Sequence, residues 1–264
     1  MFQLIDTHAH TYSKQFSNDQ AAAVDRAKAA GVVQILLPNV DVESLEPLKT
    51  LIENFPDFYQ PMMGIHPCSV KENWQEELTN IEQFFLDGNL KPIAIGEIGL
   101  DYYWDKTHVA EQKAALEYQC ELALKRNLPV ALHTRESMDD ALEIIGTFAK
   151  RGLKGVYHCF SGDKTQANAA LDMGFYLGIG GTVTYKNNPL GDMLSTLDRE
   201  KLMNHLLLET DSPYLAPVPY RGKRNESAYI PLVLHKLAES LQLPAELIAN
   251  QTTKNACELF SLSL

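Results

Sequence analysis

The sequence predicts an α/β fold, a single (β/α)8 barrel of the TIM type closed by two C-terminal helices. Three observations predict it: apolar strand-like runs alternate with segments of helical period, eight such runs occur, and 264 residues is the size of one large barrel. A doubly wound open sheet shows the same alternation and is the alternative. Since no linker rich in Pro, Gly or Ser divides the chain, we expect one domain spanning residues 1–264.

The eight strands are expected where β-branched residues or leucines gather into short runs. Strands of a parallel sheet are buried on both faces, so their sequences are nearly continuous apolar runs. The expected strands are Gln3–Asp6, Val33–Leu37, Tyr59–Ile65, Pro92–Gly96, Pro129–His133, Gly155–His158, Phe175–Ile179 and Leu206–Glu209.

Helices are expected between these strands, where apolar residues recur at helical spacing. The first is expected to end at Gly31. The expected helices are Asp19–Ala30, Glu43–Asn54, Glu76–Leu86, His108–Arg126, Ser137–Lys150, Lys164–Met173 and Leu190–Asp198, followed by the closing helices Tyr229–Leu241 and Pro244–Leu259.

The composition limits the partners and the compartment. With 23 basic and 34 acidic residues the formal charge is −11, which argues against capture of a polyanion by the whole surface. A nucleic acid would have to be held by local features. There is no apolar run long enough for a membrane span and no signal peptide, so we expect a cytoplasmic protein with no membrane contact and no obligate protein partner. The four cysteines form no CxxC pair and are expected to be reduced.

Polar residues with metal-binding side chains stand where the expected strands end. His8 and His10 follow the first strand, and residues i and i+2 of a strand point to the same side. The later strands end in the same manner, on His66, Glu97, Asp101, His133, His158, Glu209 and Asp211. The carboxyl ends of barrel strands converge on one mouth. Because buried charges are costly unless they are paired or bound to metal, this joint pattern favours a metal centre over core packing.

Six of these residues are predicted to be metal ligands: His8, His10, Glu97, His133, His158 and Asp211. Six ligands are too many for one tetrahedral ion, so we expect two divalent ions. Four imidazoles favour Zn²⁺ or Mn²⁺, and availability in the cell could select Mg²⁺. Glu97 is expected to bridge two ions about 3.5–4 Å apart.

The same stretches carry a family resemblance. The segments IDTHAH, GIHP, AIGEIGLDY, LPVALHTRES, VYHCFSG and LLLETDSPYLAP resemble the TatD family of metal-dependent hydrolases, within the amidohydrolase-like barrels, and NQTTKNACELF resembles its last helix. The resemblance implies a barrel with ligands at the six positions named above. It also implies deoxyribonuclease activity, typically removal of nucleotides from single-stranded 3′ ends, or in some members removal of D-amino acids from transfer RNA.

Three residues are predicted to be catalytic. Asp211 is expected to accept the proton of a metal-activated water, with a pure ligand role as the alternative, and Glu97 to bridge the ions. His66 is not needed as a ligand and is assigned as a hydrogen-bond donor to the substrate or leaving group, or else to a structural role. Asp6 is expected to orient a ligand imidazole, or simply to form a buried hydrogen bond.

Three further residues are grouped on the substrate side. Arg135 is expected to pair with a phosphate, or else with Glu136 or Asp139. Arg224, in the basic stretch after the last strand, is also expected to bind phosphate. The alternative is that it is an ordinary charged residue on a solvent-exposed face. Glu209 shares a strand face with Asp211 and is expected to support the site from behind, or to form an ordinary ion pair. The aromatic run from Tyr102 to Trp104 could stack on unpaired bases.

Three functions are compatible with this pattern. The first is a two-metal phosphodiesterase, of deoxyribonuclease type, acting on single-stranded DNA or RNA ends. The second is an amidohydrolase or esterase acting on a small cyclic amide or a D-aminoacyl ester, which would depend little on Arg224. The third is a non-catalytic barrel. Loss of a metal ligand or of the catalytic base would favour it, and the sequence retains all of these residues. The basic stretch and the resemblance favour the first function, and the low pI of about 5.2 argues against it.

Overall fold

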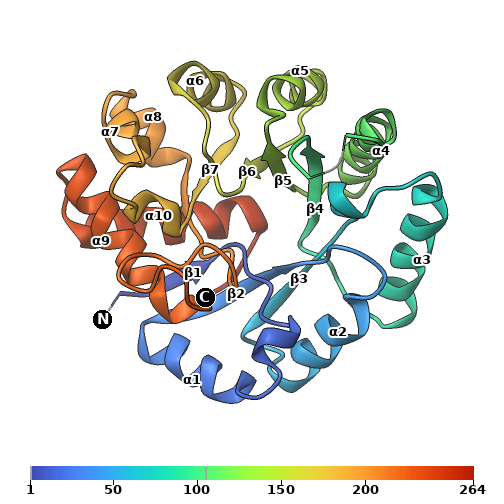
Figure 1. Cartoon of the computed structure of the whole chain (residues 1–264), viewed down its shortest axis with the longest axis horizontal. Helices are drawn as coiled ribbons and strands as arrows, with labels where there is room; N and C mark the ends of the chain where they lie inside the picture. Colours follow the sequence, from blue (N-terminus) through green and yellow to red (C-terminus); the bar gives the residue numbers. More distant parts are fainter. Residues whose placement is uncertain (1, 105) are drawn as a thin grey trace.

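Eight parallel strands form one sheet in the order β1 to β8, and the helices surround it in a ring (Figure 1). This is a computed structural model, which describes residues 2–104 and 106–264. The predicted barrel is confirmed. The strands are β1 (Leu4–Asp6), β2 (Val32–Pro38), β3 (Tyr59–Met63), β4 (Ala94–Asp101), β5 (Val130–Arg135), β6 (Gly155–Tyr157), β7 (Tyr176–Ile179) and β8 (Leu206–Leu208).

The helices follow the strands as the sequence predicted, with one break. The α-helices are α1 (Gln20–Ala29), α2 (Leu45–Asn54), α3 (Trp74–Asp87), α4 (Val109–Arg126), α5 (Met138–Ala149), α6 (Lys164–Asp172), α7 (Leu190–Ser195), α8 (Arg199–Asn204), α9 (Ile230–Leu241) and α10 (Ala245–Phe260). The single helix expected at Leu190–Asp198 is wrong, because Asp198 caps a new helix, α8, by accepting a hydrogen bond from the Lys201 amide.

The fourth strand is longer than predicted. It was expected to end at Gly96, but β4 continues to Asp101, with a shift in its pairing to β5 between Ile95 and Ile98. Gly99 lies at φ 146°, where a side chain would be strained, and a Cβ there would collide with the backbone of His133. The glycines that looked like a strand end therefore allow β4 to lie close against β5.

The barrel interior is filled from alternate strand positions. Seven strands contribute one buried side chain each to an inner layer, and Tyr176 of β7 packs against it. The end of α10 closes the layer at the amino end of the barrel, where Ala256, Leu259 and Phe260 meet Ile5, Leu36, Met62, Ala94, Ala131, Val156 and Leu207. The neighbouring strand positions pack outward against the helices. Since α10 fills the amino end of the barrel, the open mouth lies at the carboxyl ends of the strands.

The four cysteines are free thiols. Among the described residues, no helix has the length and apolar character needed to cross a membrane.

Candidate metal centre

The barrel closes between the segments that follow β1 and β8, at its mouth. The Thr7 amide donates to the Leu208 carbonyl at 3.1 Å, the Asp211 amide to the His8 carbonyl at 2.9 Å, and the His10 amide to the Ser212 carbonyl at 2.6 Å. These backbone bonds bring residues from the two ends of the chain together. Asp211 Oδ1 consequently lies 3.4 Å from His10 Nε2 and 3.9 Å from His8 Nε2.

Glu97 lies at the centre, and its two carboxylate oxygens face different pairs of imidazoles. Oε2 lies 3.2 Å from His8 Nε2 and 3.3 Å from His10 Nε2. Oε1 lies 2.9 Å from His133 Nδ1 and 2.8 Å from His158 Nε2. The carboxylate is buried. We call these five residues together with Asp211 the ligand cluster; they are the six positions that the sequence predicted as ligands.

Hydrogen bonds behind His10 and His133 fix which ring nitrogen carries the proton. Tyr12 donates its hydroxyl proton to the Pro38 carbonyl at 2.7 Å, so at 2.9 Å it can only accept from His10 Nδ1. Asp101 Oδ2 lies 2.9 Å from His133 Nε2, while its Oδ1 accepts from the Tyr103 amide. In the neutral form of both histidines the nitrogen that faces Glu97 is therefore left with its lone pair, and this is the form that binds a metal.

His158 is held from behind by Glu209. Its Nδ1 lies 3.4 Å from Glu209 Oε1, and the same oxygen accepts a 2.5 Å hydrogen bond from the Cys159 amide. Glu209 is fully buried, and a Cβ at Gly178 would collide with its carboxylate. Glu209 is not among the residues that line the mouth cavity, and of the two roles expected for it the supporting role is the one that its contacts favour.

His66 presents a different chemistry to the same carboxylate. Its Nδ1 accepts a hydrogen bond from the Cys68 amide at 3.1 Å, which leaves the proton of the neutral ring on Nε2. That Nε2 lies 3.3 Å from Glu97 Oε1 and lines the cavity. Burial lowers the pKa of His66, so the neutral ring, with an N–H directed at the site, is favoured.

The electrostatics of the ligand cluster fit a bound cation. Burial alone would lower the pKa of both His10 and His158. Tyr12 and Asp211 nevertheless raise the pKa of His10 well above its usual value. Glu97 and Glu209 do the same for the pKa of His158. The His8 ring is stacked on the His158 ring at 3.8 Å, and burial together with His158 lowers the pKa of His8. The cluster thus attracts positive charge but cannot protonate every imidazole, a conflict that divalent cations between the lone pairs resolve.

The backbone around the cluster is also unusual. Asp211 and Cys159 adopt φ values of 55° and 44°, and Glu136 and Leu215 lie at 55° and 51°. All four follow strand ends at the mouth. Left-handed conformations are unfavourable for these residue types and gather at functional sites, so the strain is consistent with a built site.

A cavity of about 790 Å³ opens above the ligand cluster. Among the described lining residues, Arg135 is the one arginine or lysine, and Trp104 and Tyr214 supply large aromatic surfaces. The Arg135 guanidinium lies 3.7 Å from the centre of the Tyr103 ring. Of its alternative partners, Glu136 lies 3.8 Å from Lys106 and Asp139 accepts from Gln166. The volume suits a small molecule or the end of a chain.

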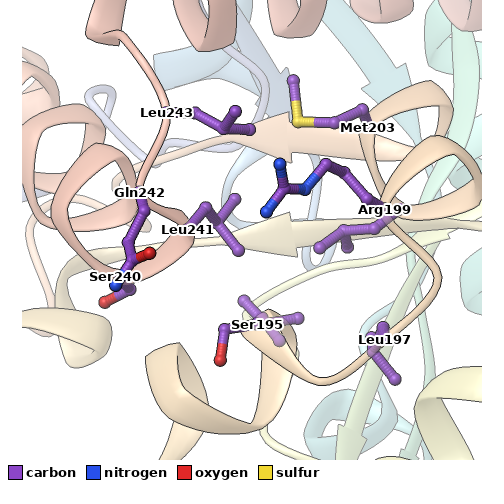
Figure 2. A pocket seen from close by; sticks show the side chains of 10 residues that line it. Ser195, Leu197, Arg199, Met203, Ser240, Leu241, Gln242 and Leu243 are labelled. Carbon is purple, nitrogen blue, oxygen red and sulfur yellow. The ribbon is translucent and has the colours of Figure 1, made fainter.

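A smaller hollow, of about 180 Å³, lies between α7, α8 and the end of α9 (Figure 2). Its described lining consists of leucines and Met203 with Arg199 and a few small polar side chains, and includes no histidine or carboxylate. It therefore cannot bind a metal ion in the way the mouth cavity could.

Comparison with known proteins gives the family. The model described as TatD related DNase matches residues 5–261. The chain belongs to the TatD family. It is 36% identical over 260 residues to the metal-dependent hydrolase YabD of Bacillus subtilis, covering 98% of this chain and all of that protein. It is 31% identical to the 3′-5′ ssDNA/RNA exonuclease TatD of Pantoea ananatis, again over 98% of this chain and all of the relative.

Solved structures agree with this. The TatD homologue YjjV of Escherichia coli superimposes with a TM-score of 0.89 at 31% identity, covering 98% of both chains. As a TatD-family protein the chain is a metal-dependent hydrolase, and groups of its histidines and acidic residues lie close enough to hold metal: His8 with His10 and Asp211, His8 with His158 and Glu209, and His66 with Glu97 and His133.

For Asp6 of this TatD-family protein the structure shows the alternative of a buried hydrogen bond, and for Arg224 it shows an ion pair in place of the expected phosphate contact. The Asp6 carboxylate accepts hydrogen bonds from the amide and hydroxyl of Thr210 at 2.9 and 2.6 Å, so it fixes the backbone before Asp211 and does not orient a ligand ring. Arg224 is bound to Asp19 at 2.6 and 2.8 Å, and the Gln15 carbonyl accepts from it at 2.8 Å.

Arg224 therefore does not reach the mouth cavity. Together with Asp19, Arg26 and Glu226 it forms the salt-bridge cluster, in which Arg26 Nε donates to both oxygens of Glu226 at 3.0 Å. The expected phosphate contact of Arg224 is not supported, because the guanidinium is already occupied by a carboxylate.

Tyr12 is the functional residue that the sequence reading missed. It lies two positions after His10 but in a turn, where the i, i+2 rule of strands does not apply, and its role depends on the Pro38 carbonyl.

Proposed function

We propose that this protein is a divalent-metal-dependent phosphodiesterase that removes nucleotides from the 3′ end of single-stranded DNA, or of RNA. The observation that carries the proposal is the double-sided arrangement of Glu97, whose two oxygens face two separate pairs of imidazoles beneath a cavity with Arg135 at its rim. Two-metal sites of this kind suit in-line displacement at phosphorus. The name of the Pantoea relative supports the substrate and the polarity.

The ligand cluster would hold two cations. His8, His10 and Asp211 would bind one, His133 and His158 the other, and Glu97 would bridge them. When bound, divalent ions lower the pKa of a water molecule toward about 7 and neutralise charge on the phosphoryl oxygens. Nitrogen ligands in this number favour Zn²⁺ or Mn²⁺.

The remaining steps are assigned to side chains of the chain itself. Asp211, whose side chain is 13% exposed, is at the edge of the cluster and is the candidate to take the proton of the attacking water. His66 lines the cavity with its Nε2–H 3.3 Å from Glu97 Oε1, and this N–H would donate a hydrogen bond to the leaving oxygen. Arg135 would bind a phosphate with its open guanidinium edge, while the ring of Tyr103 holds the guanidinium plane.

The test is an assay of the purified protein, stripped of metal and reloaded singly with Zn²⁺, Mn²⁺ or Mg²⁺. End-labelled single-stranded and duplex oligonucleotides are offered in parallel with a D-aminoacyl ester. We expect a ladder that shortens from the 3′ end of the single strand, with at least one metal. Hydrolysis of the ester without any cleavage of the oligonucleotides would overturn the proposal in favour of the amidohydrolase alternative.

A further inference from the structure

Two groups of large apolar side chains are exposed at the mouth of the barrel. Tyr103 and Trp104, which follow β4, are 50% and 68% exposed. Tyr214 and Leu215, which follow β8, are 53% and 39% exposed. Of these four residues all but Tyr103 line the mouth cavity. Single apolar side chains are commonly scattered over a protein surface, but a group of exposed aromatic side chains beside one cavity is typical of a binding site.

The two groups lie across the mouth from one another. In the ring of eight strands β4 and β8 are four strands apart, which puts them on opposite sides of the barrel. Each group also contacts the site itself. The Tyr214 ring lies 6.0 Å from the ring of His10, and the Arg135 guanidinium lies 3.7 Å from the centre of Tyr103 and 5.2 Å from that of Trp104.

We propose that these residues form a two-sided clamp for unpaired nucleobases, with Trp104 and the Tyr103–Arg135 stack on one side and Tyr214 with Leu215 on the other. The inference rests on the proposed function and makes it more specific. Bases flanking the scissile phosphate would lie against aromatic faces on both sides, while the phosphate reaches the ligand cluster below. Every base has such a face, so the clamp selects single-stranded ends and not a base sequence.

The charge of the surroundings favours this path for the strand. A neighbouring groove of about 430 Å³ shares Thr134 and Ser161 with the mouth cavity, but Glu136, Asp139 and Asp140 line it. Glu136 and Asp140 are paired with Lys106 and Lys113, and no lysine or arginine is among the described lining residues of this groove to receive a phosphate. Near the clamp, in contrast, the guanidinium of Arg135 can neutralise a phosphate. A strand leaving the cavity is therefore directed over the aromatic rim.

The kinetic test compares Trp104→Ala and Tyr214→Ala with the unaltered holoenzyme on a short single-stranded oligonucleotide. Loss of one base–aromatic stack should raise KM about 5- to 150-fold, with little change in kcat. The matched control variant is Tyr118→Ala, because Tyr118, at 49%, is about as exposed as Tyr214 but lies on α4 and does not line the cavity. Its KM should not change.

An abasic oligonucleotide of the same length tests the chemistry of recognition. It keeps every phosphate but offers no base, so Trp104→Ala and Tyr214→Ala should leave its KM unchanged. An equal rise in KM on the abasic strand would show that these side chains act on the backbone or on the fold, and would overturn the clamp.

A binding measurement separates failure of the clamp from failure of the proposed function. The sequence has two tryptophans, and Trp74 is buried in the core, so Trp74→Phe leaves Trp104 as the reporter. Oligo(dT) should quench its fluorescence, and the abasic strand should not. Quenching without cleavage would support the clamp and remove the nuclease assignment. Cleavage with an unquenched Trp104 and unchanged KM values in both variants would remove the clamp alone.

Discussion

Two clusters of charged side chains join distant parts of this chain, and they differ in how their charges are balanced. The salt-bridge cluster has two acids and two arginines. Asp19 lies 2.6 Å from Arg224 and 2.9 Å from Arg26, and Glu226 lies 2.5 Å from Arg26 and 3.5 Å from Arg224. In the ligand cluster, Glu97 and Asp211 face four imidazoles. Hydrogen bonds orient two of these rings, those of His10 and His133, so that their lone pairs point toward the carboxylates.

The difference separates a structural cluster from a functional one. The salt-bridge cluster satisfies itself and is partly exposed, so it fastens the segment after β8 to α1 without needing a ligand. In the ligand cluster His8, His10, Glu97 and His158 are buried, and the cluster cannot satisfy itself without a cation. Sequence position alone did not distinguish them, since both Arg224 and Asp211 follow β8.

The largest expected effect comes from Glu97→Ala. It removes the carboxylate that faces all four imidazoles, so we expect loss of metal binding together with a fall in kcat/KM of at least about 10³-fold, since metal ions contribute several kcal/mol to such reactions. Metal content and turnover are measured on the same preparation. The surface carboxylate Glu121, paired with Arg151, supplies the control variant Glu121→Ala, which should match the parent. Full activity in Glu97→Ala would contradict the bridging role.

The second largest effect is expected from removal of metal, which should destabilise the protein through the ligand cluster and not through the salt-bridge cluster. A ligand that binds only the folded state, and whose free concentration is about 100 times its Kd, adds about 2.7 kcal/mol to the free energy of unfolding. Chelation should therefore lower Tm by about 5 °C or more for a chain of this size. The same chelator should not change the Tm of Glu97→Ala. If chelation shifts the Tm of both proteins equally, the metal is bound outside the ligand cluster.

A smaller effect is expected from Tyr12→Phe, which removes only the hydroxyl that holds His10 Nδ1. Loss of a partner behind a metal-bound histidine lowers metal affinity by about 10- to 100-fold. The matched control is Tyr157→Phe, because the Tyr157 hydroxyl is buried and has no hydrogen-bond partner within the described chain. Titration calorimetry with Zn²⁺ or Mn²⁺ measures both. Equal affinities in the two variants would show that Tyr12 does not position His10.

The smallest effect is expected from Arg224→Ala in the salt-bridge cluster. Partly exposed ion pairs contribute up to about 1 kcal/mol, so the free energy of unfolding should fall by about that much while metal affinity and KM stay unchanged. Hydrogen bonds from Arg224, with Arg26, hold the pKa of Asp19 well below its usual value of 3.8. The stabilisation is therefore present above that value and lost as the pH falls below it.

Urea unfolding at neutral and at acid pH measures this contribution. The difference between Arg224→Ala and the parent should be full near pH 7 and shrink as Asp19 is protonated. A rise in KM for an oligonucleotide, with stability unaltered, would instead restore Arg224 to the substrate site.

Much of the fold and of the candidate site could be predicted because both depend on local periodicity. Apolar runs identify strands, and the i, i+2 rule places His8 and His10 on one side. The extension of β4 could not be predicted, because Gly96 and Gly99 look like a turn unless the close approach of β5 is known. The break between α7 and α8 was missed since Asp198 can either continue or cap a helix.

The sequence by itself determined the order of the strands and the polar residues that lie near their carboxyl ends, because these follow from which side chains must be buried. Only the tertiary structure decided how those residues are used. The hydroxyl of Tyr12 and the carboxylate of Asp101 set the protonated nitrogen of His10 and His133, and Asp19 removes Arg224 from the mouth. Hydrogen bonds and ion pairs depend on distances between segments far apart in the chain, which no local pattern records.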